Sequence, residues 1–377
     1  GAATNIQWAI NVATNGETVL VSGGTYYLTN QITINNGILL KSFSGSYADT
    51  VVNGNYPIVT SRCFNVASSG AIIDGFTITN GYAPTNNQHG GGAYISAGTL
   101  RNCLLTGNTV TNDGIGGGAY VIGMYGLVTN CILIGNTAFN YGGGIGAGTS
   151  GTVHNCHIMQ NRVNSSAMYK GGGGAYLSGV NASLQNTVII SNTAHYEAGG
   201  VYMNINTFLR NCLIARNTSR RGGGIFSFMN NTAHSNKIEN CTIVCNVATG
   251  GVYEGSGING AYRGLTYLFN TIAYSNINQN TWGYDSITNI SYSSCTISNS
   301  RTIFADSGNS TSSPAFADFS ADNYHLTRGS PCVNSGLNLP WMTDSIDLDG
   351  KARIDKSGVV DKGCYEYQRR GFMVKMR

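Results

Sequence analysis

Residues 102–108 read Asn-Cys-Leu-Leu-Thr-Gly-Asn, and this pattern of Asn, Cys, an apolar stretch and a second Asn recurs along the chain. The two Asn lie six residues apart in each copy. Copies begin at Asn102, Asn130, Asn155, Asn186, Asn211, Asn240 and Asn270, with degenerate copies at Asp74 and Ser294. The eight steps from Asp74 to Ser294 cover 220 residues, about 27 per repeat. A period of this size is typical of stacked-repeat proteins.

A second motif, three Gly followed by an apolar and an aromatic residue, precedes the first motif in several repeats. It occurs at 90–94, 116–120, 172–176 and 222–226, with a shorter version at 199–202. Gly permits the positive φ angles and close backbone approaches of tight corners. Two short strands and Gly-rich corners per repeat fit one coil of a solenoid, whereas helical repeats need long stretches of 3.6-residue period. We therefore predict an all-β parallel β-helix with coils stacked about 4.8 Å apart.

Stacked coils place equivalent residues in columns. Two Asn positions per coil predict two Asn ladders that also bind the backbone of the corners. The Cys positions form a column in which Thr replaces Cys twice: Cys103, Cys131, Cys156, Thr187, Cys212, Cys241 and Thr271. Thr fits a packing role and does not fit metal ligation, so we expect stacked, buried thiols. Disulfides within the column and a bound metal are the alternatives.

Composition excludes several classes of protein. Only 10% of residues are charged, and the net charge of +4 is mild and scattered, unlike a nucleic-acid-binding surface. No apolar run reaches the roughly 18 residues of a transmembrane helix. With 41% hydrophobic residues, the chain is also too apolar to be disordered.

The repeat defines three regions: an N-terminal cap at 1–30, β-helix coils at 31–300 and a C-terminal module at 301–377. Thr4 or Asn5 is expected to cap a short helix over the first coil, because the apolar residues that follow have helical spacing. Strands are expected at 18–21 and 32–34.

Three short motifs mark the C-terminal module: Gly-Ser-Pro-Cys at 329–332, Asp-Leu-Asp-Gly-Lys-Ala-Arg at 347–353 and Asp-Lys-Gly-Cys-Tyr-Glu at 361–366. They resemble the module that ends many bacterial right-handed parallel β-helix repeat proteins of the "choice-of-anchor" type. The start of the chain, 6–26, is similar to the same proteins. The resemblance implies a right-handed, pectate-lyase-like β-helix and secretion or surface display. The chain's first residue, Gly1, also fits a mature, exported protein.

The resemblance also bears on two cysteines. Its usual pattern has Ala where this chain has Cys364. We therefore expect a disulfide between Cys332 and Cys364 that is particular to this protein.

Candidate catalytic residues are few. The acidic residues between 74 and 300 are neither adjacent nor stacked on neighbouring coils, which disfavours the paired carboxylates of glycoside hydrolases. His154 and Arg210 are the candidates for catalysis, in the column before the first Asn. The alternative for this column is a solvated polar stripe.

Two further groups are candidate binding sites. An aromatic column, which either stacks on sugar rings or only stabilises the sheet, contains Tyr94, Tyr120, Tyr176, Tyr202 and Phe226. Asp347 and Asp349 either hold Ca²⁺ or close a turn with their own side chains. No other cofactor is expected.

The strand after each Cys is apolar on both faces, which normally means burial on both. One parity places Phe76, Leu104, Ile132, Val188, Leu213 and Ile272 on the outer face. Either the C-terminal module covers this face, or another copy of the chain does. The last residues alternate similarly, with Phe372, Val374 and Met376 on one side of a predicted strand.

Two functions follow from these patterns. The first is a secreted, non-enzymatic structural or adhesive surface protein that assembles with itself or with other surface proteins. The alternative is a protein that binds an extracellular polysaccharide, or cleaves one as a lyase or hydrolase. Neither involves nucleic acid or a transmembrane segment.

Overall fold

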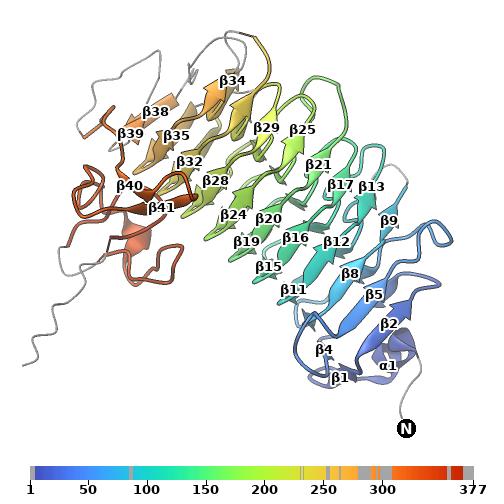
Figure 1. Ribbon diagram of the computed structural model, residues 1–377. Coiled ribbons are helices and arrows are strands. Elements are labelled where there is room, and N and C mark those ends of the chain that lie inside the picture. The colour runs from blue at the N-terminus through green and yellow to red at the C-terminus, as the bar shows by residue number, and fades with distance from the viewer. Residues whose placement is uncertain are drawn as a thin grey trace, which may run out of the picture.

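The computed structural model describes residues 5–84, 88–229, 231, 233–251, 255–262, 265–278, 290–293, 296–297, 308–354 and 358–367. The chain forms a right-handed parallel β-helix whose coils stack along one axis (Figure 1), as the repeat and the resemblance predict. No described helix is long and apolar enough to cross a membrane.

A complete coil has four strands, where the repeat predicted two. Strands of successive coils pair in parallel and form four sheets, named A to D. Along each complete coil the chain passes through sheets A, B, D and C in that order. Sheet A contains β1 (Thr18–Val21), β4 (Leu39–Ser42), β7 (Ile72–Asp74), β11 (Gly98–Arg101), β15 (Gly126–Thr129), β19 (Thr152–His154), β23 (Ser183–Gln185), β27 (Phe208–Arg210), β31 (Ser235–Glu239), β35 (Leu265–Phe269) and β38 (Ile290–Ser293). Sheet B contains β2 (Gly24–Tyr27), β5 (Thr50–Asn53), β8 (Thr77–Thr79), β12 (Leu104–Thr106), β16 (Ile132–Ile134), β20 (His157–Met159), β24 (Val188–Ile190), β28 (Leu213–Ala215), β32 (Thr242–Val244), β36 (Ile272–Tyr274) and β39 (Thr296–Ile297).

The other two sheets close the coil. Sheet C contains β3 (Ile32–Ile34), β6 (Phe64–Val66), β10 (Ala93–Ile95), β14 (Ala119–Val121), β18 (Ile145–Ala147), β22 (Ala175–Leu177), β26 (Val201–Met203), β30 (Ile225–Met229) and β34 (Ile258–Tyr262). Sheet D has two-residue strands, β9 (Tyr82–Ala83), β13 (Thr109–Val110), β17 (Thr137–Ala138), β21 (Arg162–Val163), β25 (Thr193–Ala194), β29 (Thr218–Ser219), β33 (Val247–Ala248) and β37 (Ile277–Asn278). Gly triplets lie between sheets D and C, where a Cβ on Gly117 would approach the Gly143 and Thr137 carbonyl oxygens to 2.4 Å.

The second Asn of the repeat forms a continuous buried ladder, as predicted. From Asn108 to Asn276, each side-chain amide donates to the Oδ1 of the Asn one coil further, at 2.9–3.0 Å. The first Asn of the repeat instead makes the corner between sheets A and B with a positive φ, for example 54° at Asn102. Its ladder is only partial: Asn211 donates to Asn186, and Asn270 donates to Asn240.

The Cys column is buried and its thiols are free, as predicted. Each thiol donates to a backbone carbonyl two residues earlier, at 3.1 Å from Cys103 to Arg101. Burial raises the pKa of Cys131 and Cys241. The column therefore acts as packing for the interior of the coils.

The N-terminal cap is the helix α1 (Ile6–Val12), capped by the side chain of Asn5, which accepts from the Trp8 amide. The strands expected at 18–21 and 32–34 are β1 and β3. Both β1 and β2 already pair in register with the next coil, so the solenoid begins inside the predicted cap.

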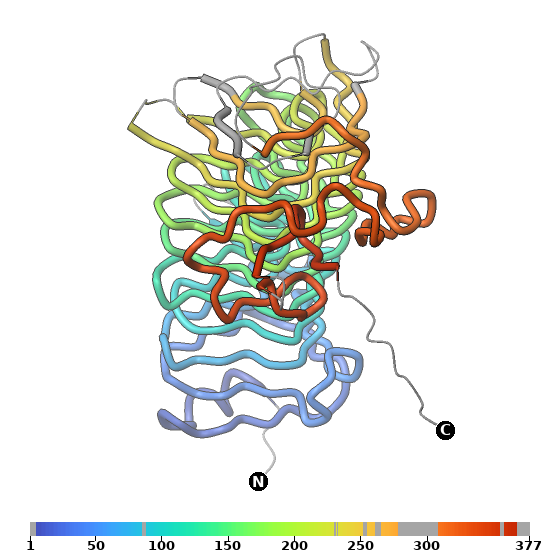
Figure 2. Tube along the Cα trace, turned by 90° about the vertical axis from the view of Figure 1, so that its left-hand side faces the viewer, coloured from blue at the N-terminus to red at the C-terminus, as the bar shows by residue number. Residues whose placement is uncertain are grey.

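The C-terminal module contains the antiparallel pair β40 (Phe316–Asp318) and β41 (Asn323–Leu326) and the short 3₁₀ helix η1 (Pro340–Met342). It does not continue the stack but lies against the side of the coils (Figure 2). Three successive corner Asn hold it: Asn211 donates to Ile346 O, Asn240 to Asp361 O and Asn270 to Leu337 O.

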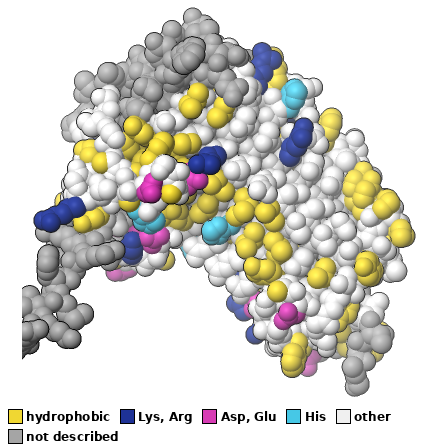
Figure 3. Space-filling view, viewed as in Figure 1, with side chains coloured by type: hydrophobic (Ala, Val, Ile, Leu, Met, Phe, Trp, Pro, Cys, Tyr) yellow, Lys and Arg dark blue, Asp and Glu magenta, His cyan; other side chains and the backbone are white. Residues whose placement is uncertain are grey.

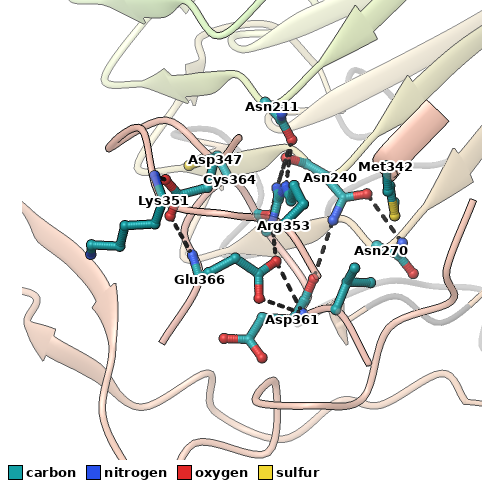
Figure 4. A network of polar contacts seen from close by, with 12 residues as sticks. Asn211, Asn240, Asn270, Met342, Asp347, Lys351, Arg353, Asp361, Cys364 and Glu366 are labelled. Atoms are coloured by element: carbon teal, nitrogen blue, oxygen red, sulfur yellow. Dashed lines mark hydrogen bonds and ion pairs between the residues drawn. The ribbon is translucent and has the colours of Figure 1, made fainter. Parts of the chain in front are cut away.

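A buried arginine from the Asp-Leu-Asp-Gly motif completes this contact (Figure 4). Arg353 is fully buried and donates twice to Asn211 Oδ1, at 2.7 and 2.8 Å, and once to Gly363 O. On its other side it forms an ion pair with Glu366, which also accepts from the Asp361 amide. The motif residues therefore build the joint between module and solenoid.

Candidate functional site

The polar stripe predicted on sheet A is a real column. Pairing of β11, β15, β19, β23, β27 and β31 aligns Arg101, Thr129, His154, Gln185, Arg210 and Glu239. The adjacent outward column aligns Thr152, Ser183, Phe208 and Lys237. Side chains from successive coils thus stand about 4.8 Å apart on one face.

A shallow hollow of about 330 Å³ lies on this face. Its floor is formed by β19, β23 and β27, and its side by corner residues between sheets C and A. The lining residues are Met124, Ser150, Thr152, Asn181, Ser183, Gln185, Phe208 and Arg210. Most of these side chains can donate or accept hydrogen bonds, and Phe208 adds an aromatic ring.

Arg210 connects the hollow to the C-terminal module. Its Nε lies 2.5 Å from Glu239 Oε2, and its guanidinium lies 5.2 Å from the Trp341 ring and 5.4 Å from the Phe208 ring. Lys237 lies 5.8 Å from the same Phe208 ring. Among the described residues, no carboxylate pairs with Lys237. Because Glu239 is buried beneath Arg210, the accessible charge at this end of the hollow is positive.

His154 stands two coils from Arg210, about 10 Å along the column. Burial lowers the pKa of His154, so its imidazole is neutral near pH 7. No described side chain bridges His154 and Arg210. The two candidates therefore share a face and not a contact.

The aromatic column does not present ring faces to a ligand as the binding prediction requires. Tyr120, Tyr176, Tyr202 and Phe226 are buried, and only Tyr94 is half-exposed. The residues just before the Gly corners cover them, because they form their own parallel row through Ile115, Tyr141, Gly171, Glu197 and Arg221. The rings instead pack on one another, at 5.2 Å for Tyr202 and Phe226.

One position of this column is a glycine. Gly146 pairs between Tyr120 and Tyr176, and a Cβ there would lie 2.7 Å from the Tyr120 ring. Tyr141, which lies in the row of residues that covers the column, compensates for the missing ring by stacking on Tyr176 at 4.4 Å. The column is therefore a structural cluster.

No family model matches this chain, and no curated protein matches it in sequence. Its fold is similar to that of a pectate lyase. Pectate lyase Pel9A matches with a TM-score of 0.59 and 17% identity, over 97% of this chain and 92% of that one.

Two weaker structural matches are also found. Alginate lyase AlyF-OU02 gives a TM-score of 0.39 and 11% identity, over 97% of this chain and 93% of that one. Pectin methylesterase from Aspergillus niger gives 0.34 and 13%, over 81% and 88%. At these identities the likeness concerns the fold alone.

The apolar outer face of sheet B is covered in cis at its C-terminal end. Leu213 is buried under Tyr324 and Cys364 of the module, and Ile272 under Leu326. Leu104, Ile132 and Val188 remain half-exposed. Figure 3 shows hydrophobic side chains running across the face that carries β12 to β24, beside the module. The module thus covers one half of the face.

The prediction that Phe76 lies on this outer face is wrong. It is fully buried, and its amide contacts Cys103 Sγ at 3.4 Å. The degenerate repeat begins at Gly75 and not at Asp74, because Thr77 pairs with Leu104 and Gly75 takes the positive-φ corner that Asn102 takes one coil later. Phe372, Val374 and Met376 lie outside the described residues.

The expected disulfide is not formed in the structure, where Cys332 and Cys364 are both thiols. They pack in separate clusters, Cys332 beside Ile272 and Cys364 beside Leu213. Burial raises the pKa of Cys364 to about 12. Each sulfur therefore fills a gap between module and solenoid.

Asp347 and Asp349 have protein partners at their carboxylates. Asp347 accepts the amides of Asp349, Lys351 and Glu366 at 2.7–2.9 Å. Asp349 contacts Lys351 Nζ at 2.7 Å and His325 Nε2 at 2.8 Å. The described residues contain no group of three His, Cys, Asp or Glu side chains placed to hold a metal. The side-chain-closed turn is therefore the arrangement observed.

The residues that line the hollow or lie beside it were mostly missed from the sequence. Phe208 and Lys237 lie in the column next to the polar stripe, and their spacing from Arg210 could have revealed them. Trp341 and Met124 could not be found in this way, because they come from the module and from a corner far away in sequence.

Proposed function

We propose that this protein binds an extended, anionic polysaccharide outside the cell, along the outer face of sheet A. The observation that carries the proposal is the hollow, where polar side chains, the Phe208 ring and an accessible positive charge occur together. This is the second of the two functions predicted from the sequence. The pectate-lyase-like fold supports it, because the matched protein carries a polysaccharide substrate in its name.

The spacing of the site suits a linear polymer. Stacked coils repeat contacts about every 4.8 Å, so consecutive sugar units can meet equivalent columns. Ser183 and Gln185 offer hydrogen bonds at the centre, and Phe208 offers a ring face. Lys237 and Arg210 attract carboxylates, since charge-assisted hydrogen bonds contribute about 1.5–3 kcal/mol.

Removing the cation or the ring should weaken binding. We expect Lys237→Gln and Phe208→Ala each to lower affinity for oligogalacturonate about tenfold, a change of about 1.4 kcal/mol. Isothermal calorimetry with a length series of the oligosaccharide measures this. Lys41→Gln, a lysine on the same sheet four coils or more from the hollow, should leave affinity unchanged. Equal binding of a neutral glucan, or unchanged affinity in both variants, contradicts the proposal.

A second candidate, cleavage by β-elimination, is favoured by one observation. His154 is neutral at pH 7 and faces outward on the same column as Arg210. A neutral imidazole can accept the proton next to a uronate carboxylate, and a cation stabilises the resulting charge.

If elimination occurs, His154→Ala should abolish the formation of unsaturated products, followed by ultraviolet absorbance, while leaving affinity nearly unchanged. Because burial lowers the pKa of His154 from 6.5, turnover should persist at pH 6.5 and fall only at lower pH. His157→Ala, on sheet B, is the matched control. Unchanged turnover in His154→Ala would exclude this histidine as the base.

A further inference from the structure

The helix α1 closes the first coil only in part. Its Gln7 side chain mimics a strand, donating to Thr33 O at 3.0 Å and accepting from the Thr33 amide at 2.7 Å, so it caps the edge of sheet C. Sheets A and B end at β1 and β2, with no described strand beyond either. An end strand presents unpaired backbone groups to any strand that approaches it.

The outer edge of β1 faces a groove. Leu39 N donates to Glu17 O at 2.9 Å, and Phe43 N donates to Val21 O at 2.8 Å. Glu17 and Val21 therefore turn their backbone groups toward β4. The alternation of a parallel ladder turns the N–H and C=O of Thr18 and Leu20 the other way. They point into the space between β1 and α1.

This groove has a volume of about 650 Å³ and runs the length of the strand, from Glu17 to Ser22. Large apolar side chains stand exposed along it: Trp8 is 57%, Val12 59% and Leu20 56% exposed. A cap at the end of a solenoid normally has a polar outer face. Glu17 is the one charged residue among those that line the groove.

We propose that the groove between α1 and β1 binds residues 368–377 of a second copy of this chain as an added β-strand. That segment alternates Phe372, Val374 and Met376 with other residues, which suits a half-buried strand. It carries four cations, Arg369, Arg370, Lys375 and Arg377, and no acid, which complements Glu17. Main-chain bonds to Thr18 and Leu20 would hold the strand, and the apolar side chains would cover Trp8 and Leu20.

The segment cannot reach the groove of its own chain. Tyr367, which precedes it, packs in the cluster with Ile272 of β36. Nine inter-strand steps separate β36 from β2, about 43 Å at 4.8 Å each. Ten residues span at most about 36 Å. The module also lies beside β28 and β32, away from the end of the solenoid that carries α1 (Figure 1). The contact is therefore head-to-tail between copies and generates rings or filaments.

Light scattering on the full chain and on a variant lacking 368–377 tests the proposal. We expect the full chain to form multiples of 39.8 kDa and the truncated variant to remain monomeric at the same concentration. A synthetic peptide of residues 368–377 should bind the truncated variant and change the fluorescence of Trp8, with Trp8→Phe as the control for the signal.

An edge substitution locates the contact. Leu20→Pro removes an N–H that faces away from β4, so it should weaken peptide binding at least tenfold without lowering the melting temperature appreciably. Leu20→Thr keeps the N–H and should bind. The proposal is overturned if the full chain is monomeric and the peptide does not bind, or if Leu20→Pro binds the peptide as well as Leu20→Thr does.

Discussion

Replacing Arg353 with methionine is expected to lower the free energy of unfolding by about 3–5 kcal/mol at pH 9, where the ionised Glu366 would lose its partner in a buried ion pair. Arg353 is fully buried and satisfies Asn211, Gly363 and Glu366 at once. Methionine fills part of the volume and leaves the Glu366 carboxyl without a cation. Chemical denaturation measures the loss, and limited proteolysis after residue 308 shows whether the module detaches.

The loss should also depend on pH. Burial raises the pKa of Glu366 to about 8, and Arg353 opposes this shift. Without Arg353 the pKa of Glu366 in the folded state rises further. A protein with such a carboxyl loses stability as the pH rises from the ordinary pKa of 4.5 through the raised pKa of the folded state. The variant should therefore be less stable at pH 9 than at pH 6. Arg328→Met, an exposed residue of the same module, should change stability by less than about 0.5 kcal/mol. Equal effects of the two substitutions would contradict a docking role for Arg353.

Detachment of the module would have a second consequence. Leu213, Ile272 and Val244 would lose their cover, and the apolar half of sheet B would be exposed along its full length. An apolar patch of that size favours association. Aggregation of the Arg353 variant on heating is therefore expected before the coils themselves unfold.

The repeat contained most of the information about the coils. The six-residue spacing of Asn and the repeated Cys both result from coils that stack in register. The buried Asn ladder and the column of buried thiols could therefore be predicted from the sequence. The two-residue strands of sheet D were missed, since β13 is too short to show a period. Phe76 was misplaced because Asp74 imitates the first Asn, whereas Gly75 occupies that corner.

The site was harder to predict, for a physical reason. The stripe through His154 and Arg210 follows from coil spacing alone. A hollow also depends on the corner residues and the module residues that lie beside the sheet. Trp341 reaches Arg210 only because Asn211, Asn240 and Asn270 hold the module at that corner. Burial of the aromatic column likewise depends on a row of corner residues that share no sequence pattern.

The same columns that build the solenoid also limit where a function can occur. Sheet C turns its outward column under corner residues, and the module occupies half of sheet B. Sheet A keeps polar, half-exposed side chains over several coils. A linear ligand that follows the axis can therefore contact successive coils on sheet A without displacing any part of the protein.

Replacing Asn161 with alanine is the second substitution with a large expected effect, about 2–4 kcal/mol, since a buried donor left unsatisfied costs about 1–3 kcal/mol. Asn161 lies in the middle of the ladder and is almost fully buried. Its Oδ1 accepts the backbone N–H and the side-chain amide of Asn136 at 2.9 and 3.0 Å. Its Nδ2 donates to Leu133 O at 2.8 Å and to Asn192 Oδ1 at 3.0 Å. Alanine removes all four bonds.

The ladder geometry makes this prediction specific to the position of Asn161. Asn161→Asp keeps both acceptor contacts with Asn136 and loses both donated bonds. It should destabilise the protein because a buried carboxylate repels the Leu133 and Asn192 oxygens, and it should recover stability at low pH as the carboxyl protonates. Asn164→Ala, an exposed position three residues later, is the control and should be nearly neutral. Thermal and urea unfolding of the three variants distinguish a cooperative ladder from independent turns: if Asn161→Ala costs no more than Asn164→Ala, the ladder does not contribute to the stability of the coils.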